Sequence, residues 1–266
     1  MKQFNYFEAI YLSFFSADFY RDVKSNWKGY GFLYLTVLLA FCWVITVLKM
    51  QVGLTDYIDN TMPKYINQIP KMSVVDGVLK TEEEHPYFIK DIETGSTVAI
   101  IDMTGEHSNI EDENVKILVS SDFISTKKDN GEIRSYPVNQ FGDITIERED
   151  LEKWASFLKY GFSFVALPFF LFFSFLYRMI QAFVYGGIGM LISNVLKVKL
   201  DYQILVRISV MAITPVIILE TIRDLADVEI PYWGWLCFLI AVALVYFGIQ
   251  SNRLKPESES LESQNH

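Results

Sequence analysis

The sequence predicts an α-helical multi-pass membrane bundle of four or five transmembrane helices with an inserted small β-rich extracytoplasmic domain. Three observations lead to this fold class. The 266-residue chain has a mean hydropathy of +0.22 although 21% of its residues are charged. Residues 50–155 hold 21 acidic and 10 basic residues, a net charge of −11. The other 160 residues hold 11 acidic and 13 basic residues and contain long uncharged runs. One chain therefore combines an acidic, polar segment with apolar segments.

The same numbers exclude several classes of protein. A single soluble globule would not separate its charge and its apolar residues so completely, and an intrinsically disordered chain would lack the apolar runs. A nucleic-acid-binding protein would present a dominant basic patch, which is absent from this sequence.

Uncharged runs mark the candidate membrane helices. The first has 20 residues, and at about 1.5 Å per residue it matches the hydrocarbon thickness of a bilayer. The runs are residues 29–48, 160–177, 179–196 and 230–252, together with about 203–222, which Arg207 and Glu220 interrupt. Interfacial aromatic side chains cluster at their ends: Trp27, Tyr30, Trp154, Tyr160, Tyr232, Trp233 and Trp235.

Residues 160–196 leave the number of crossings open. These 37 residues are too long for one upright crossing, yet no glycine, proline or asparagine near Arg178 favours a turn there. Five crossings would violate the positive-inside rule, because they would place Lys197, Lys199, Arg253 and Lys255 outside. One crossing plus a membrane-embedded half would satisfy the rule. Hydropathy favours five helices and charge favours four; we expect five.

Basic residues before the first run set the expected topology. Lys2, Arg21, Lys24 and Lys28 place the N-terminus in the cytoplasm, and residues 50–155 outside the cell membrane. The first run begins too late for a cleavable signal peptide and is predicted to be an uncleaved anchor. The expected segments are a cytoplasmic arm (1–28), a first transmembrane helix (29–49), the β-rich domain (50–155), the remaining bundle (156–252) and a polar disordered tail (253–266).

Aromatic residues recur at helical spacing in the arm, at Phe4, Phe7, Tyr11 and Phe14. Such a helix would lie along the inner membrane surface, or it would be a plain extension of the first membrane helix; both alternatives stay open.

The outer segment has strand and turn signals. Asp76-Gly77 between apolar pairs predicts a β-hairpin over residues 73–79, and a second hairpin is expected from strands 123–127 and 133–138. Further strands are expected at 97–103, 116–120 and 144–147. Residues 54–68 are predicted to be helical, and a helix beginning near Arg148 is expected to run unbroken into the membrane.

Residues with catalytic potential are sparse. Cys42 and Cys237 lie in apolar runs, so no disulfide is expected in the outer domain. Asp102 is best interpreted as part of a turn after a strand, and His107 among nearby acids is expected to be a surface residue rather than a metal ligand. We therefore expect no catalytic, cofactor-binding or metal-binding residues, and no enzyme activity.

Small residues form a stripe in the second apolar block. Ala182, Gly186, Gly189 and Ser193 lie on one helix face and are expected to allow close helix packing. A transport path lined by the flexible Gly186-Gly187 pair is the minority alternative.

Three charges and one proline are notable within the apolar runs. Arg178, Arg207 and Glu220 are costly near lipid and need partners, and Arg178 and Glu220 are expected to pair between helices at one membrane face. Pro215 is expected to kink its helix.

Sequence motifs resemble two families. YLSFFS at 11–16, FYR at 19–21, NWKG at 26–29, IPK at 69–71, DGV at 76–78 and AIID at 99–102 resemble a bacterial family, found mainly in Firmicutes, called domain of unknown function 1189. The resemblance covers nearly the whole chain, and because some members are labelled maltodextrin-utilisation proteins it implies a loose tie to sugar uptake. YGGIG at 185–189 with AITP at 212–215 is similar to the Yip-type multi-pass membrane family, although Met211 stands at its usual aromatic position.

Two functions follow as hypotheses. The first is a non-enzymatic accessory or sensor protein whose outer domain binds a ligand or partner; the second is a small transporter or channel component. The expected partners are the lipid bilayer and another membrane or envelope protein, with no nucleic acid, no cofactor and an unidentified small-molecule ligand.

Overall fold

The computed structural model describes residues 2–82 and 85–253 of the chain. The chain divides into two compact units, and the residues of each unit mainly contact one another. One unit comprises Met1–Lys49 and Ser163–His266 and is here called the helical unit, and the other comprises Met50–Phe162 and is called the β-rich unit. The predicted tail at 253–266 lies outside the described residues apart from Arg253.

Four helices among the described residues are long and apolar enough to cross a membrane. The first is α3 (Phe32–Asp56), which continues through a π-helical turn, η1 (Tyr57–Thr61), into α4 (Met62–Ile66). The second is α5 (Arg148–Leu196). The third is a 24-residue helix made of α6 (Tyr202–Ala212) and α7 (Thr214–Leu225), which are separated by Ile213. The fourth is α8 (Trp233–Gln250).

Helix α5 corrects the expectation of five membrane helices. Its 49 residues continue through Arg178 without a turn, and even Pro168 lies inside the helix. Because nothing in the sequence around Arg178 favours a turn, the backbone keeps its helical hydrogen bonds there. The preference for five helices is therefore wrong. The expected unbroken helix from Arg148 is confirmed.

The N-terminal arm folds into two helices of its own. Helix α1 (Tyr6–Leu12) begins with a capping box between Asn5 and Glu8, and α2 (Ala17–Asn26) begins with the side chain of Ser16 as its N-cap. Gly29 and Gly31 have positive φ angles, which turn the chain before α3 begins. The arm is therefore not an extension of the first long helix.

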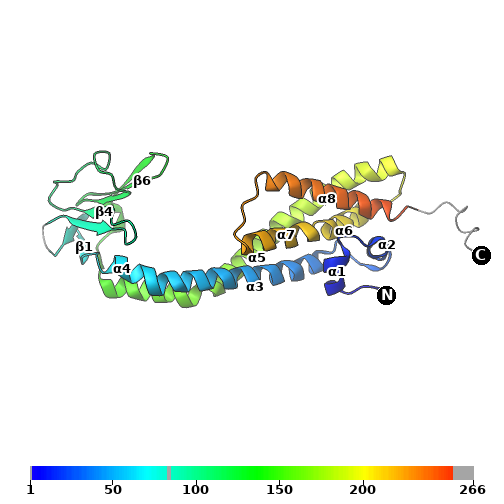
Figure 1. Cartoon of the computed structure of the whole chain (residues 1–266), viewed down its shortest axis with the longest axis horizontal. Coiled ribbons are helices and arrows are strands. Elements are labelled where there is room, and N and C mark those ends of the chain that lie inside the picture. The colour runs from blue at the N-terminus through cyan, green and yellow to red at the C-terminus, as the bar shows by residue number, and fades with distance from the viewer. Residues whose placement is uncertain (1, 83–84, 254–266) are drawn as a thin grey trace, which may run out of the picture. The chain divides into compact units, whose positions relative to one another are not determined.

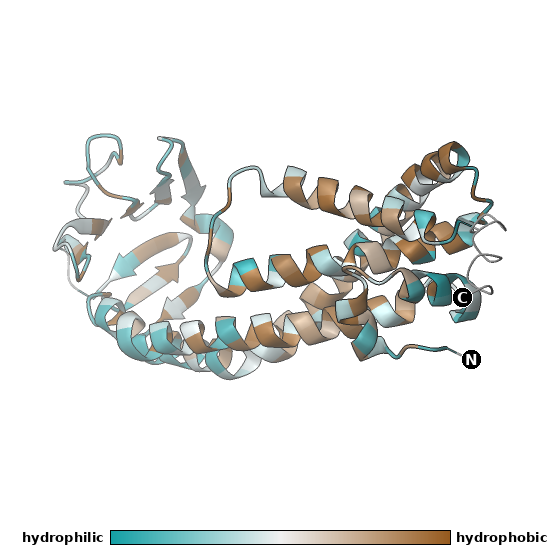
Figure 2. Cartoon of the chain, turned by 45° about the vertical axis from the view of Figure 1, so that its right-hand side comes forward, coloured by the Kyte–Doolittle hydropathy of each residue, from teal (hydrophilic) through white to brown (hydrophobic). Residues whose placement is uncertain are grey.

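The core of the helical unit surrounds α6. Eight residues of α6, Leu205 to Ala212, are buried, and α6 packs against α2, α7 and α8. Figure 2 shows that hydrophobic residues dominate the helices of this unit. Phe19 and Tyr20 of α2 are fully buried in the same core, so the arm is an integral part of the unit.

The β-rich unit contains two sheets (Figure 1). Its strands are β1 (Met72–Val75), β2 (Val78–Thr81), β3 (Tyr87–Lys90), β4 (Thr97–Ile101), β5 (Ile117–Val119), β6 (Phe123–Lys127), β7 (Ile133–Pro137) and β8 (Ile144–Ile146). The smaller sheet has the order β2-β1-β8, and the larger has the order β3-β4-β5-β6-β7 with only the β4–β5 pair parallel. A short 3-10 helix, η2 (Val138–Phe141), precedes β8.

Both predicted hairpins are confirmed. Asp76 and Gly77 have φ angles of 53° and 77°, as a tight two-residue turn between antiparallel β1 and β2 requires. Strands β6 and β7 pair from Phe123 with Pro137 to Lys127 with Ile133. Strand β3, which directly follows Pro86, is absent from the sequence-based prediction.

Candidate functional site: charged and small residues of the helical unit

Arg178 of α5 and Glu220 of α7 form an ion pair. The Arg178 guanidinium also donates to the Gln181 side chain at 2.7 Å and lies over the Tyr177 ring. Arg178 is only 7% exposed, so it depends on these partners. The expected pairing between helices is present, although the hairpin from which it was reasoned does not exist.

Arg207 of α6 is held by backbone carbonyls. Its guanidinium donates to the carbonyl of Gly29 at 2.7 Å, to that of Val23 at 3.0 Å, and to that of Trp27. Because α2 ends at Asn26, these carbonyls have no helical partner, and a cation there also suits the helix dipole. Arg207 therefore fastens the N-terminal arm to α6, a role that neither its spacing nor its hydropathy indicated.

Asp22 is a buried charge that the sequence analysis missed. It is 3% exposed and accepts hydrogen bonds from the Trp27 indole at 2.9 Å, the Asn26 amide at 2.6 Å and the Gln3 backbone at 3.1 Å. Burial by itself raises the pKa of the Asp22 carboxyl, but these hydrogen bonds together hold the pKa below its usual value. The carboxylate thus organises the end of α2 from within.

The small-residue stripe lies in helix contacts. A Cβ atom on Gly186 would lie 2.7 Å from Cγ2 of Val206, and one on Gly189 would lie 3.4 Å from Cγ1 of Val245. Ala182 is fully buried. These contacts favour the packing interpretation.

Ser193 of the stripe and the adjacent Gly187 refine this interpretation. Ser193 does not only provide space, because its hydroxyl donates to the carbonyl of Val198 and closes the turn after α5. A Cβ atom on Gly187 would meet nothing within 4 Å, so this glycine faces open space rather than a neighbouring helix.

Pro215 lies in the first turn of α7, directly after the interruption at Ile213. The Thr214 hydroxyl donates to the Val210 carbonyl at 3.2 Å and contacts the Tyr34 hydroxyl at 3.2 Å. These bonds satisfy polar groups at the interruption, as a buried broken helix requires.

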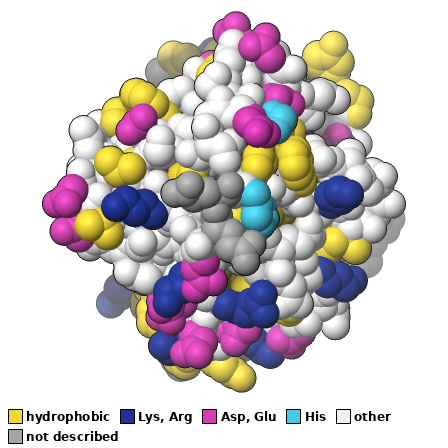
Figure 3. Space-filling model, turned by 90° about the vertical axis from the view of Figure 1, so that its left-hand side faces the viewer, with side chains coloured by type: hydrophobic (Ala, Val, Ile, Leu, Met, Phe, Trp, Pro, Cys, Tyr) yellow, Lys and Arg dark blue, Asp and Glu magenta, His cyan; other side chains and the backbone are white. Residues whose placement is uncertain are grey.

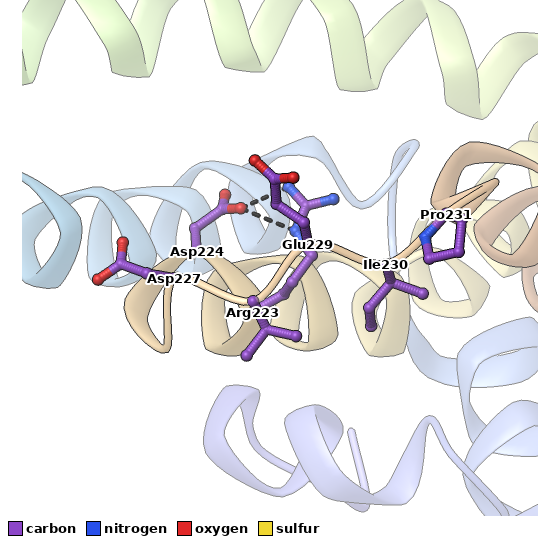
Figure 4. Close-up of a pocket in the computed structure, with 7 residues that line it drawn as sticks. Arg223, Asp224, Asp227, Glu229, Ile230 and Pro231 are labelled. Atoms are coloured by element: carbon purple, nitrogen blue, oxygen red, sulfur yellow. Dashed lines mark hydrogen bonds and ion pairs between the residues drawn. The ribbon is translucent and has the colours of Figure 1, made fainter.

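A hollow of about 740 Å³ lies in the connection between α7 and α8 (Figure 4). Its lining includes Arg223, which donates to Asp224 at 3.0 Å, together with Asp227 and Glu229. Lys49 donates to Asp227 at 2.5 Å and to the carbonyl of Asp224 at 3.0 Å. The cationic side chains near this hollow, Arg223 and Lys49, are therefore already paired with its acidic residues.

The β-rich unit carries its charges mainly on the surface, where Figure 3 shows acidic side chains dispersed among basic ones on one face. Asp102 is buried at the end of β4 and accepts from the Thr104 amide at 2.7 Å, the Thr104 hydroxyl at 2.6 Å and the His107 amide at 2.7 Å. This arrangement organises a turn, as the sequence predicts. Among the described residues, no three His, Cys, Asp or Glu side chains are grouped so that they could hold a metal ion.

His107 pairs with Glu113 within the same loop. The hydrogen bond to Glu113 raises the pKa of the His107 imidazole, with further contributions from the nearby carboxylates of Asp102 and Glu106. The imidazole is thereby paired with the Glu113 carboxylate, so the contact between the two side chains depends on pH.

Comparison with known proteins places the chain in a family. The family model described as "Protein of unknown function (DUF1189)" matches residues 7–249. The chain belongs to this family. It is also 24% identical over 267 residues to "Uncharacterized protein RP489" of Rickettsia prowazekii (strain Madrid E), a match that covers 90% of each chain. No solved structure matches. The similarity to the Yip-type family stays an expectation from the sequence.

Proposed function

We propose that this DUF1189 protein is a four-pass integral protein of the bacterial cell membrane and acts as a non-enzymatic accessory or sensor. In this proposal the β-rich unit lies outside the membrane and binds a ligand or an envelope partner, and the helical unit anchors it. A tie to carbohydrate uptake, which some members of the family suggest by their labels, belongs to the same proposal.

The charge distribution supports this topology. With four crossings, the N-terminal arm, the α5–α6 connection and the end of α8 share one side, which carries Arg21, Lys24, Lys197, Lys199 and Arg253. The α7–α8 connection lies on the other side and carries Asp227 and Glu229. The positive-inside rule then assigns the first side to the cytoplasm.

The observation that carries the accessory role is that the three charges within the apolar runs, Arg178, Arg207 and Glu220, have intramolecular partners. Arg178 pairs with Glu220, and Arg207 bonds to three carbonyls of the arm. Charges paired in this way stabilise the packing of the bundle, because an unpaired charge near lipid is costly. The ligand- or partner-binding role is therefore assigned to the β-rich unit.

The experiment is cross-linking in living cells. A photo-crosslinking amino acid is placed at exposed apolar positions of the β-rich unit, Phe88, Phe123 and Phe141, and at the lipid-facing Phe164 as a control. The accessory role predicts one discrete adduct from the β-rich positions that Phe164 does not give. Adducts to lipid or none from all positions would contradict it.

The alternative is a small transporter or channel component, which the helix interruption at Ile213 favours. It predicts solute flux in reconstituted vesicles that Glu220→Gln alters. Flux that is absent from the wild-type protein would remove this alternative.

A further inference from the structure

A groove at one end of the helical unit is lined by basic residues from three separate parts of the chain. Its basic portion, about 430 Å³, is lined by Lys24 of α2, Lys197 and Lys199 of the α5–α6 connection, and Arg253 after α8. Figure 1 shows α2, the start of α6 and the end of α8 at the same end of this unit. We call this portion the basic groove.

One wall of the basic groove is the turn between α5 and α6. Val198 is buried between the exposed Lys197 and Lys199. The Val198 amide donates to the Ser193 carbonyl at 3.0 Å, and the Ser193 hydroxyl returns a bond to the Val198 carbonyl. Lys197 has a φ of 54°, a region that glycine usually occupies. The turn is thus fixed so that two lysines flank one buried residue.

Another part of the lining is the end of α8, which hydrogen bonds connect to α2. Arg21 donates to the Ser251 carbonyl at 2.9 Å, and the Asn252 amide donates to the Gly248 carbonyl at 2.8 Å and to the Tyr20 carbonyl at 3.3 Å. These bonds place Arg253 on the same groove as Lys24. The cationic side chains are therefore gathered by a built structure rather than by chance exposure.

The positive charge of the basic groove is not neutralised by the described residues. None of its four cationic side chains forms an ion pair with an acid in the described part of the chain, whereas Lys49, Lys71 and Lys159 each do. Asp201 is the one acid among the residues that line the groove and its extension. An anion would complete the site.

The groove continues into an apolar extension. A second hollow of about 660 Å³ shares the three lysines and is lined further by Met190 of α5 and by Ile204 and Leu205 of α6. A small anion would use only the basic portion. A molecule with an anionic head and a hydrocarbon chain would use both portions.

We propose that this groove binds an anionic phospholipid of the inner leaflet, with its phosphate among Lys24, Lys197, Lys199 and Arg253 and an acyl chain along Met190 and Ile204. Basic pockets between helices on the cytoplasmic side provide the charge complementarity that lipid headgroups need. The inference rests on the proposed membrane insertion and topology, and it adds a defined lipid site to them.

The experiment is native mass spectrometry of the full-length protein in mild detergent, titrated with dioleoylphosphatidylglycerol, dioleoylphosphatidylcholine or glycerol 3-phosphate. We expect phosphatidylglycerol adducts to dominate. Lys24→Gln with Lys199→Gln should weaken them about 30-fold, because each basic residue near an anionic headgroup is worth roughly a fivefold change in affinity. The charge-matched control, Lys28→Gln with Lys64→Gln, removes two cations that do not line the groove and should leave binding unchanged.

Several results would overturn the proposal. Equal binding of the two lipids, or loss of binding in the control pair, would remove the site. Binding of glycerol 3-phosphate as tight as that of the lipid would assign it to a soluble phosphate compound instead. If the double variant does not fold, exposed Lys199→Gln alone must still weaken binding about fivefold. Resistance of the protein to carbonate extraction tests membrane insertion separately, so failure of the lipid site and failure of the topology are distinguishable.

Discussion

Gly248 of α8 and Tyr20 of α2 lie in direct contact. A Cβ atom on Gly248 would lie 2.7 Å from Cδ1 of Tyr20 and 2.8 Å from Cγ2 of Ile208, and Tyr20 is fully buried. Helices α2 and α8 therefore pack against each other through a position that only glycine fits. This contact brings two helices that are far apart in the sequence together in the core of the helical unit.

Gly248→Ala is expected to destabilise the helical unit by about 1–3 kcal/mol, the usual cost of overpacking a buried contact. Gly187→Ala is the matched control, because it lies inside a helix and its Cβ would meet nothing within 4 Å. Alanine there should stabilise α5 by roughly 0.5–1 kcal/mol through helix propensity. Thermal unfolding in detergent, followed by circular dichroism, should move in opposite directions for the two variants. Equal shifts would mean that the close contact is not formed.

The Arg178–Glu220 pair should show strong coupling. Glu220→Gln and Arg178→Gln are each expected to lower the level of folded protein and to reduce the free energy of unfolding by about 1–3 kcal/mol. Glu220→Gln leaves the buried Arg178 without its counter-charge, and Arg178→Gln does the same to the half-buried Glu220. Replacing both residues, as Arg178→Met with Glu220→Leu, should cost less than the sum of the single changes. A double-mutant cycle of melting temperatures measures this coupling. If neither single change alters abundance or melting temperature, the pair is not structural.

Arg207→Lys is expected to release the N-terminal arm, because one ammonium cannot reproduce the guanidinium bonds to the carbonyls of Gly29, Val23 and Trp27. The free energy of unfolding should fall by about 2–4 kcal/mol, because hydrogen bonds to charged groups cost more to remove than neutral ones. Limited proteolysis of the purified protein should then cut within residues 13–31 much faster. Arg134→Lys, at an exposed strand position, is the control and should leave the rate unchanged.

Periodicity and turn chemistry predicted the elements whose cause is local. The Asp76-Gly77 hairpin, strands β6 and β7, and the unbroken start of α5 depend on neighbouring residues only. The role of Arg207 depends on where α2 ends in space, and Gly248 depends on Tyr20, which is far away in the sequence. No local pattern encodes such contacts. The preference for five helices is wrong because the length of the apolar segment 160–196 favours two helices, whereas the backbone turns only where the sequence provides a turn signal, and none is present at Arg178.

The His107–Glu113 contact gives the β-rich unit a pH dependence of known sign. The pKa of His107 is raised in the folded protein by its hydrogen bond to Glu113. The stabilisation is therefore fully present below the imidazole's unfolded pKa, about 6.5, and is lost as the pH rises through the higher folded value. We expect NMR titration of the full-length protein to give a His107 pKa above that of a histidine in an unfolded peptide.

Glu113→Gln should return this pKa toward about 6.5, since the amide supplies no counter-charge. His107→Gln should remove the part of the pH dependence of the free energy of unfolding above about pH 6.5 that belongs to this contact. His85→Gln is the matched control, because His85 lies outside the loop from Asp102 to Glu113, and it should leave the His107 titration unchanged. A His107 pKa that does not respond to Glu113→Gln would show that the imidazole and the carboxylate are apart in solution.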